Sequence, residues 1–185
     1  MIGPLIAALG FGWFAVPSIG ESYWKTFLPA IVVLGFGMAV TVAPLTTVVM
    51  NSVSHERVGT ASGINNAVAR LAGVLAIAVL GIVMVTVFSS RLSRSLAQLS
   101  LPPAVGQEIQ ANAIKLAGLQ APADLNPSMK SAVEDSVKEA FIFGFRTVML
   151  TCACLALIGA AVTWLMIPRD PDRRARAATE AHAEL

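Results

Sequence analysis

Two long stretches of this chain contain no charged residue, and they constrain its fold more than any other feature. Residues 26–54 contain no aspartate, glutamate, lysine or arginine, and neither do the 20 residues 71–90. Within residues 27–50 apolar side chains occupy every face of a helix rather than one stripe, which is typical of a helix surrounded by lipid. Twenty helical residues rise about 30 Å, the thickness of the hydrocarbon layer of a bilayer. We therefore expect a polytopic membrane protein.

The composition excludes two other classes of protein. Hydrophobic residues make up 56% of the chain and charged residues 13%, with a mean hydropathy of +0.72. A soluble domain has about a quarter of its residues charged, so this chain has too little polar surface to cover a water-soluble fold. The net charge of +2 is scattered rather than clustered on one face, which argues against a nucleic-acid partner.

Four apolar segments are predicted to cross the bilayer as helices, giving an all-α membrane protein. The first covers residues 1–16 and is barely long enough; the last begins near residue 141 and is interrupted by Arg146, although residues 147–168 are uncharged. Four crossings place both termini on one side. The arginines that follow residue 168 favour a cytoplasmic tail, because basic residues are enriched on that side. The prediction is a multi-pass protein of the inner (plasma) membrane with both termini in the cytoplasm.

The corresponding division of the chain has four parts. Residues 1–90 hold the first three spans and their loops, residues 91–140 form an extracytoplasmic helical hairpin, residues 141–168 form the last span, and residues 169–185 form a basic cytoplasmic tail. Within the hairpin, apolar residues recur at helical steps. These are Val105, Ile109, Ala113 and Leu116 in one arm and Met129, Val133 and Val137 in the other. Asn126 followed by Pro127 predicts the start of the second arm, which is expected to continue into the last span.

The third span carries small and polar residues along one predicted face. Steps of three and four from the preceding hinge reach Gly59, Gly63, Asn66, Arg70 and Gly73. Small residues at this spacing let two helix backbones approach closely inside a membrane. Helix packing is the simpler interpretation of the stripe, and a cavity lined by its polar members is the functional one.

No motif for catalysis or for a cofactor is found in the sequence. P-loop, HExxH, GxSxG, GxGxxG and Cys/His metal spacings are absent, so we predict a protein that is not an enzyme and has no metal or cofactor. Cys152 and Cys154 are two residues apart and point to different sides of a helix. None of the eleven acidic residues falls in a predicted span, although proton-coupled transport usually needs a titratable group there.

The pattern nevertheless resembles a known transporter family. The resemblance rests on residues 34–38 (LGFGM), 43–46 (APLT) and 59–63 (GTASG), with Asn66 and Arg70. These are similar to the C-terminal part of major facilitator superfamily transporters, in particular the fourteen-helix drug/proton antiporters of the EmrB/QacA type. The resemblance implies the last four of fourteen helices, with the hinge at residues 54–59 in the cytoplasm and the hairpin outside.

The resemblance also implies roles and partners. It carries over Gly35, Gly37, Pro44, Gly59, Gly63, Asn66 and Arg70 as structural and gating positions, and the stripe adds Gly73. Met38, Thr41, Met50 and Asn66 are the candidates to face a substrate cavity. The function implied is proton-coupled efflux of lipophilic compounds across the lipid bilayer. Because the family's proton-relay acid lies in the amino-terminal half, transport would require the missing N-terminal helices.

An alternative of another class is a small four-helix structural or accessory membrane protein with no transport of its own. It accounts equally well for spans without acidic residues. The stripe on the third span tells against it, because a four-helix bundle offers few partner helices for such a face.

Overall fold

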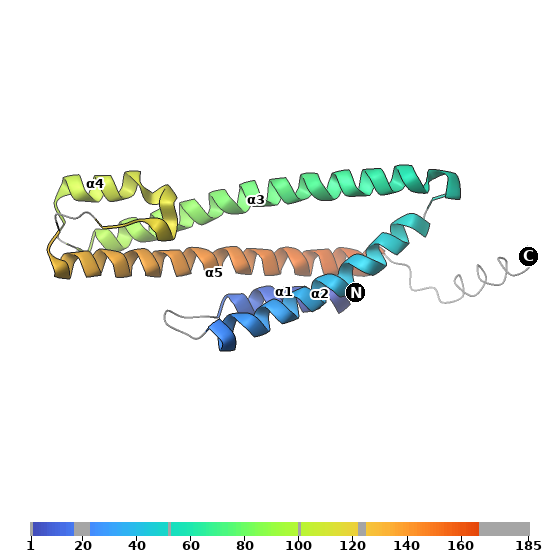
Figure 1. Ribbon diagram of the computed structural model, residues 1–185, viewed down its shortest axis with the longest axis horizontal. Coiled ribbons are helices and arrows are strands. Elements are labelled where there is room, and N and C mark those ends of the chain that lie inside the picture. Colours follow the sequence, from blue (N-terminus) through green and yellow to red (C-terminus); the bar gives the residue numbers. More distant parts are fainter. Residues whose placement is uncertain (1, 17–22, 52, 100, 122–124, 167–185) are drawn as a thin grey trace, which may run out of the picture.

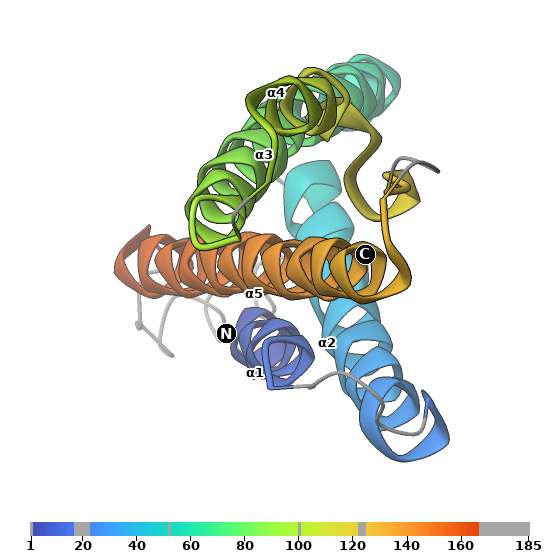
Figure 2. The ribbon, with the colours of Figure 1, turned by 90° about the vertical axis from the view of Figure 1, so that its left-hand side faces the viewer.

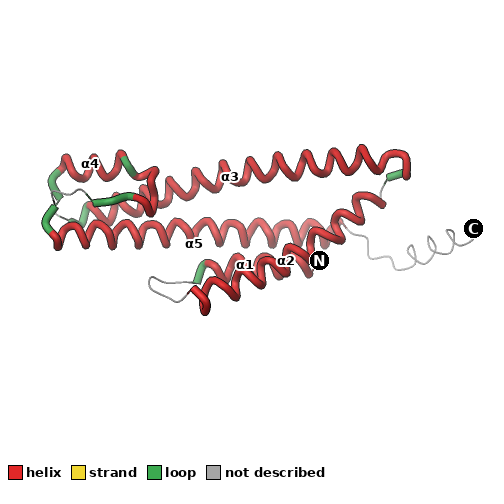
Figure 3. The backbone as a smooth tube through the Cα atoms, in the orientation of Figure 1, coloured by secondary structure: helices red, strands yellow, loops and turns green. Residues whose placement is uncertain are grey.

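The computed structural model describes residues 2–16, 23–51, 53–99, 101–121 and 125–166, which form helices and no strand (Figures 1 and 3). The α-helices are α1 (Ile2–Phe14), α2 (Tyr23–Asn51), α3 (Val58–Leu96), α4 (Pro103–Ala111) and α5 (Pro127–Met166). Two 3₁₀ helices, η1 (His55–Arg57) and η2 (Ala113–Gly118), lie in the connections. The predicted tail at residues 169–185 lies outside the described residues.

Three helices are long and apolar enough to cross a membrane, namely Trp24–Asn51, His55–Leu96 and Pro127–Leu165. They confirm the second, third and fourth predicted spans as helices of spanning length, and the chain is a helical multi-pass membrane protein. The first predicted span is shorter than these three, because α1 has 13 residues and rises only about 20 Å. Its helical geometry ends ahead of Pro17, since a proline disfavours α conformation in the residue before it.

The hydrophobic core of the described chain lies at one end of the molecule, in the predicted hairpin. There the last turns of α3 and the first turns of α5 pack with α4 and η2 (Figure 1). Its buried residues are Phe88, Leu92, Leu96, Ile109, Ala113, Leu119, Ala121, Val133, Val137 and Ala140. Four of them are among the apolar residues from which the sequence predicts a hairpin.

The long helices run through the predicted hairpin boundaries without a break. α3 has 39 residues and α5 has 40, so each rises about 60 Å, roughly twice the hydrocarbon thickness. α5 begins at Pro127, and the Asn126 side chain accepts a hydrogen bond from the backbone N–H of Met129 (2.8 Å), which confirms the predicted cap. The second arm is therefore continuous with the last span.

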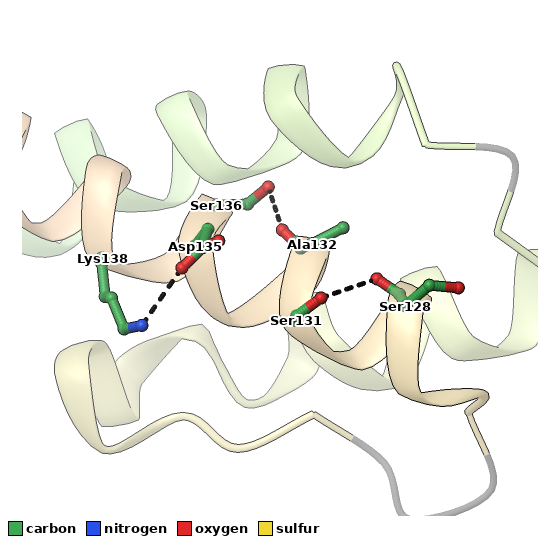
Figure 4. A network of polar contacts seen from close by, with 6 residues as sticks. All are labelled: Ser128, Ser131, Ala132, Asp135, Ser136 and Lys138. Carbon is green, nitrogen blue, oxygen red and sulfur yellow. Dashed lines mark hydrogen bonds and ion pairs between the residues drawn. The ribbon is translucent and has the colours of Figure 1, made fainter.

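The first turns of α5 are held by local polar contacts (Figure 4). The Ser131 hydroxyl donates to the carbonyl of Ser128 (3.0 Å), and the ammonium of Lys138 lies 3.1 Å from a carboxylate oxygen of Asp135. Both members of that ion pair are mostly exposed. These contacts form a largely exposed polar helix face, in the segment that the sequence predicts to lie outside the bilayer.

Seen along the long axis, α3 and α1 lie on opposite sides of α5 (Figure 2). α3 is close to α5 at the hairpin end and diverges from it toward its own first turn (Figures 1 and 2). A β-carbon placed on Gly144 of α5 would lie 2.9 Å from the sulfur of Met84, whereas one on Gly81 of α3 would meet no atom within 4 Å. Close packing between the two helices therefore ends near Met84.

Candidate functional site

The four predicted cavity residues lie on α2 and α3. Met38 is half exposed and Met50 is partly buried on α2, while Asn66 is exposed on α3. The Thr41 hydroxyl donates to the carbonyl of Gly37, 2.6 Å away on the previous turn. Met38 and Asn66 therefore have open surface around them within the described chain, and Thr41 is engaged with its own helix.

Gly37 and Gly35 differ sharply in their surroundings. A β-carbon on Gly37 would lie 2.9 Å from the α-carbon of Ala7 in α1, while one on Gly35 would find nothing within 4 Å. Of the two predicted structural glycines, Gly37 is thus the one at which α2 meets another described helix.

The contact at Gly37 belongs to a stripe of small residues on α1 that sequence reasoning did not single out. A β-carbon on Gly10 would lie 2.8 Å from the α-carbon of Leu34, and one on Gly3 would collide with Thr41. Gly3, Ala7 and Gly10 recur at steps of four and three, so they share one face of α1. The spacing of these small residues is visible in the sequence and is typical of close helix packing, but it does not identify the partner helix.

Pro44 lies inside α2, which remains helical on both sides of it. Proline has no N–H to donate to the carbonyl four residues earlier. Nearby, Thr46 and Thr47 donate their hydroxyls to the carbonyls of Val42 (3.0 Å) and Ala43 (3.1 Å). The threonines of this segment thus make the hydrogen bonds to their own backbone that are common for hydroxyls in helices.

The predicted stripe on α3 makes no close contact within the described chain. Added β-carbons on Gly59, Gly63 and Gly73 would meet no atom within 4 Å, and Asn66 and Arg70 are exposed. In the most apolar stretch of 18 residues of this helix, only 6% of the residues are buried. The face is therefore open to lipid or to helices outside the described residues.

A polar junction that the sequence did not predict joins α3 to α5. An Nη of Arg91 lies 2.6 Å from Oε1 of Glu139, and the guanidinium stands 5.3 Å from the ring centre of Phe143. Both partners are on α5, one turn apart, and the ion pair is level with the core residues Phe88 and Ala140. Their pairing depends on two residues 48 positions apart in sequence, which no local pattern reveals.

A second long-range contact joins α5 to α1. An Nη of Arg146 donates to the backbone carbonyl of Val16, 3.3 Å away, just beyond the last residue of α1. The sequence indicates only that this arginine lies near one end of the last span. The structure places its side chain at the carboxyl end of another helix.

A shallow hollow of about 210 Å³ lies in the hairpin, between α4 and η2. Its lining includes Glu108, Asn112 and Lys115. Ligand pockets for drug-sized molecules usually measure about 300–1,000 Å³, so this hollow is smaller than such a site. In the part of the chain that the structure describes, no group of three or more His, Cys, Asp or Glu residues is arranged to hold a metal ion.

Comparison with known proteins supplies the functional context for these helices. Over 146 residues the chain is 26% identical to the tetracenomycin C resistance and export protein of Streptomyces glaucescens, covering 78% of this chain and 27% of that protein. Over 144 residues it is 28% identical to the multidrug resistance protein Stp of Mycobacterium tuberculosis, covering 74% of this chain and 26% of Stp. These relatives are drug-resistance proteins. The chain spans about a quarter of their length, and neither a family model nor a solved structure matches it.

Proposed function

We propose that this chain forms the C-terminal part of a multidrug efflux transporter, a proton-coupled antiporter of the fourteen-helix EmrB/QacA type in the major facilitator superfamily. The observation that carries the proposal is the similarity of about three quarters of the chain to two proteins named for drug resistance. The sequence pattern of α2 and of the first turns of α3 points to the same family.

The open faces of the spans support a larger assembly. In the most apolar stretch of 18 residues, 11% of the residues are buried in α2 and in α5, and 6% are buried in α3. Small residues on α3 face open space at the spacing at which membrane helices pack closely. The proposal assigns this face to the N-terminal helices of the transporter, so that the 185 residues alone do not transport.

Substrate contacts and proton chemistry are divided between this chain and the N-terminal helices of the transporter. Met38, Thr41, Met50 and Asn66 contribute to a cavity for lipophilic compounds that closes only when the remaining helices are present. The titratable group that carries the proton lies outside this chain. Gly35, Gly37, Pro44, Gly59, Gly63, Arg70 and Gly73 serve packing and gating.

The proposed placement in the membrane follows the same scheme. The protein lies in the inner (plasma) membrane, with the tail after α5 and the α2–α3 connection in the cytoplasm. The hairpin built on Arg91 and Glu139 lies outside. The fully buried side chains of its core, such as Phe88 and Val133, give it a folded structure of its own rather than a loose loop.

Efflux from native cells tests the proposal. Deleting the gene that encodes this chain should raise the accumulation of ethidium, a lipophilic cation, and the native gene should restore export. A plasmid that encodes only the 185 residues should not restore it. In everted membrane vesicles energised to a proton gradient, addition of ethidium should dissipate the gradient only when the native product is present.

Two outcomes would overturn the proposal. Unchanged accumulation after deletion of the gene, together with no effect of ethidium on the gradient, would exclude export of such cations. Full export by the 185 residues alone would show that no further helices are needed. A protonophore serves as the control, because it should abolish export that depends on the proton gradient.

A further inference from the structure

We infer that Arg146 sets the register of α1 against α5, by holding the carboxyl end of α1 at one level of the longer helix. The inference concerns the packing of the first and last helices and does not use the proposed function. It rests on the length of α1, on the residues at the α1–α5 contact, and on the hydrogen bond from Arg146 to Val16.

α1 cannot fix its own depth in the membrane. Its 13 residues rise about 20 Å, whereas the hydrocarbon layer is about 30 Å thick. It also has no acidic residue in its first turn and no basic residue in its last turn, so it has no charged anchor at either end. The position of α1 therefore depends on the helices beside it.

The buried residues of α1 are small, and small apolar side chains give little resistance to sliding. On α1, Gly3, Ala7 and Gly10 face α2, while Ala8 is also buried but lies about 100° from Ala7 around the helix. Since α1 contacts α2 and α5, Ala8 is buried on the α5 side.

The matching face of α5 is headed by Arg146. Ala153 and Ala160 are buried, and they follow Arg146 at steps of seven, so all three share one side of α5. Fourteen residues separate Arg146 from Ala160, and the same number separates Ile2 from Val16, which lies two residues beyond the end of α1. The helices run antiparallel, with the start of α1 beside the later turns of α5 (Figure 1).

The hydrogen bond between Arg146 and Val16 can fix the register of the two helices, which contacts between alanines cannot do. The carboxyl end of a helix has carbonyls without partners in the helix and a partial negative charge. A guanidinium donates hydrogen bonds to such carbonyls, and its positive charge is attracted to that end of the helix. A polar contact in an apolar helix interface is a well-attested way to specify register. With this contact in place, counting along the two antiparallel helices brings Ala8, eight residues before Val16, near the level of Ala153, seven residues after Arg146.

Disulfide cross-linking tests the register directly. In the full-length protein with Cys152→Ala and Cys154→Ala, Ala8→Cys is combined in turn with Met149→Cys, Ala153→Cys or Leu157→Cys. With Arg146 present, the pair with residue 153 should cross-link best. Arg146→Ala should lower that yield about five-fold relative to the other two, on the scale of the net contribution of a hydrogen bond, and Arg146→Lys should preserve the preference because it keeps the charge and a donor.

A second cross-link separates loss of register from loss of folding. Met84→Cys with Gly144→Cys joins α3 to α5 at a close contact that does not involve α1, and its yield should be the same with Arg146 or alanine. The inference is overturned if the profile over residues 149, 153 and 157 is unchanged in Arg146→Ala. It is overturned as well if Arg146→Ala abolishes both cross-links, since the arginine would then be needed for folding in general.

Discussion

Arg91 of α3 and Glu139 of α5 form an ion pair with 2.6 Å between nitrogen and oxygen, at the point where the buried hairpin core gives way to the open spans. Phe143 extends the contact by one turn of α5, with its ring centre 5.3 Å from the guanidinium. The two helices are thus joined by charge and by an aromatic contact at the level where they leave their shared core.

Arg91→Ala is expected to lower the free energy of unfolding by about 0.5–1.5 kcal/mol, because it removes a partly exposed ion pair and a cation–π contact. Thermal unfolding of the purified protein in detergent measures the change. Lys138→Ala is the matched control, because the Lys138–Asp135 pair lies within one helix and should contribute at most about 0.5 kcal/mol. Equal effects of the two substitutions would contradict a special role for Arg91.

Phe88→Ala should destabilise the hairpin by about 3–5 kcal/mol, since it empties a fully buried site. The expected readout is faster cleavage within the hairpin when intact membranes are treated with protease. Ile114→Ala is the control, because this side chain is 75% exposed and its removal should change stability by less than about 0.5 kcal/mol. If Phe88→Ala left the cleavage rate at the level of the control, burial of Phe88 in the core would not stabilise the hairpin.

Gly37→Ala is predicted to weaken the packing of α1 on α2 by about 1–3 kcal/mol, because the new methyl group would collide with the backbone of Ala7. Gly35→Ala, two residues earlier, meets no atom within 4 Å and should be neutral or stabilise the helix by up to about 1 kcal/mol. Gly10→Ala and Gly12→Ala form a second pair: a methyl group on Gly10 would collide with Leu34, whereas one on Gly12 would meet no atom within 4 Å. Thermal unfolding of all four variants checks this, and the same loss in both members of a pair would exclude the close approach.

The sequence predicted the elements of this fold better than their contacts. Uncharged runs and the Asn126–Pro127 cap revealed the three long helices and the start of α5, because length and capping are local properties. The core residues Ile109, Ala113, Val133 and Val137 followed from helical periodicity. In contrast, the small-residue contact of α1 with α2 depends on which helices are neighbours, which periodicity does not show.

The candidate site was harder to predict for a physical reason. Small residues on α3 indicate a packing face but not its occupant, and within the described residues Gly63 and Gly73 meet no neighbour. Arg91 and Arg146 carried no local signal, since their partners lie 48 and 130 residues away in sequence. Of the two glycines predicted as structural on α2, Gly37 packs against α1, whereas Gly35 has no neighbour within 4 Å of an added β-carbon in the described chain.

Gly63→Cys should reveal what covers the α3 face. With a thiol-reactive cross-linker in native membranes, we expect attachment to a peptide that is not part of these 185 residues, as identified by mass spectrometry after digestion. Gly12→Cys is a control on a helix position that is also open but lies outside the stripe. Cross-linking of Gly63→Cys only to peptides of this chain would support a self-contained bundle.

The most direct test of the central claim is an immunoblot of membranes from the native source with an antibody raised against residues 169–185. If the chain is the C-terminal part of a larger exporter, the antibody should detect a membrane protein of more than twice the 19.3 kDa of this chain. A band near 19.3 kDa, with no partner protein retained on purification, would contradict that account and favour the small accessory membrane protein.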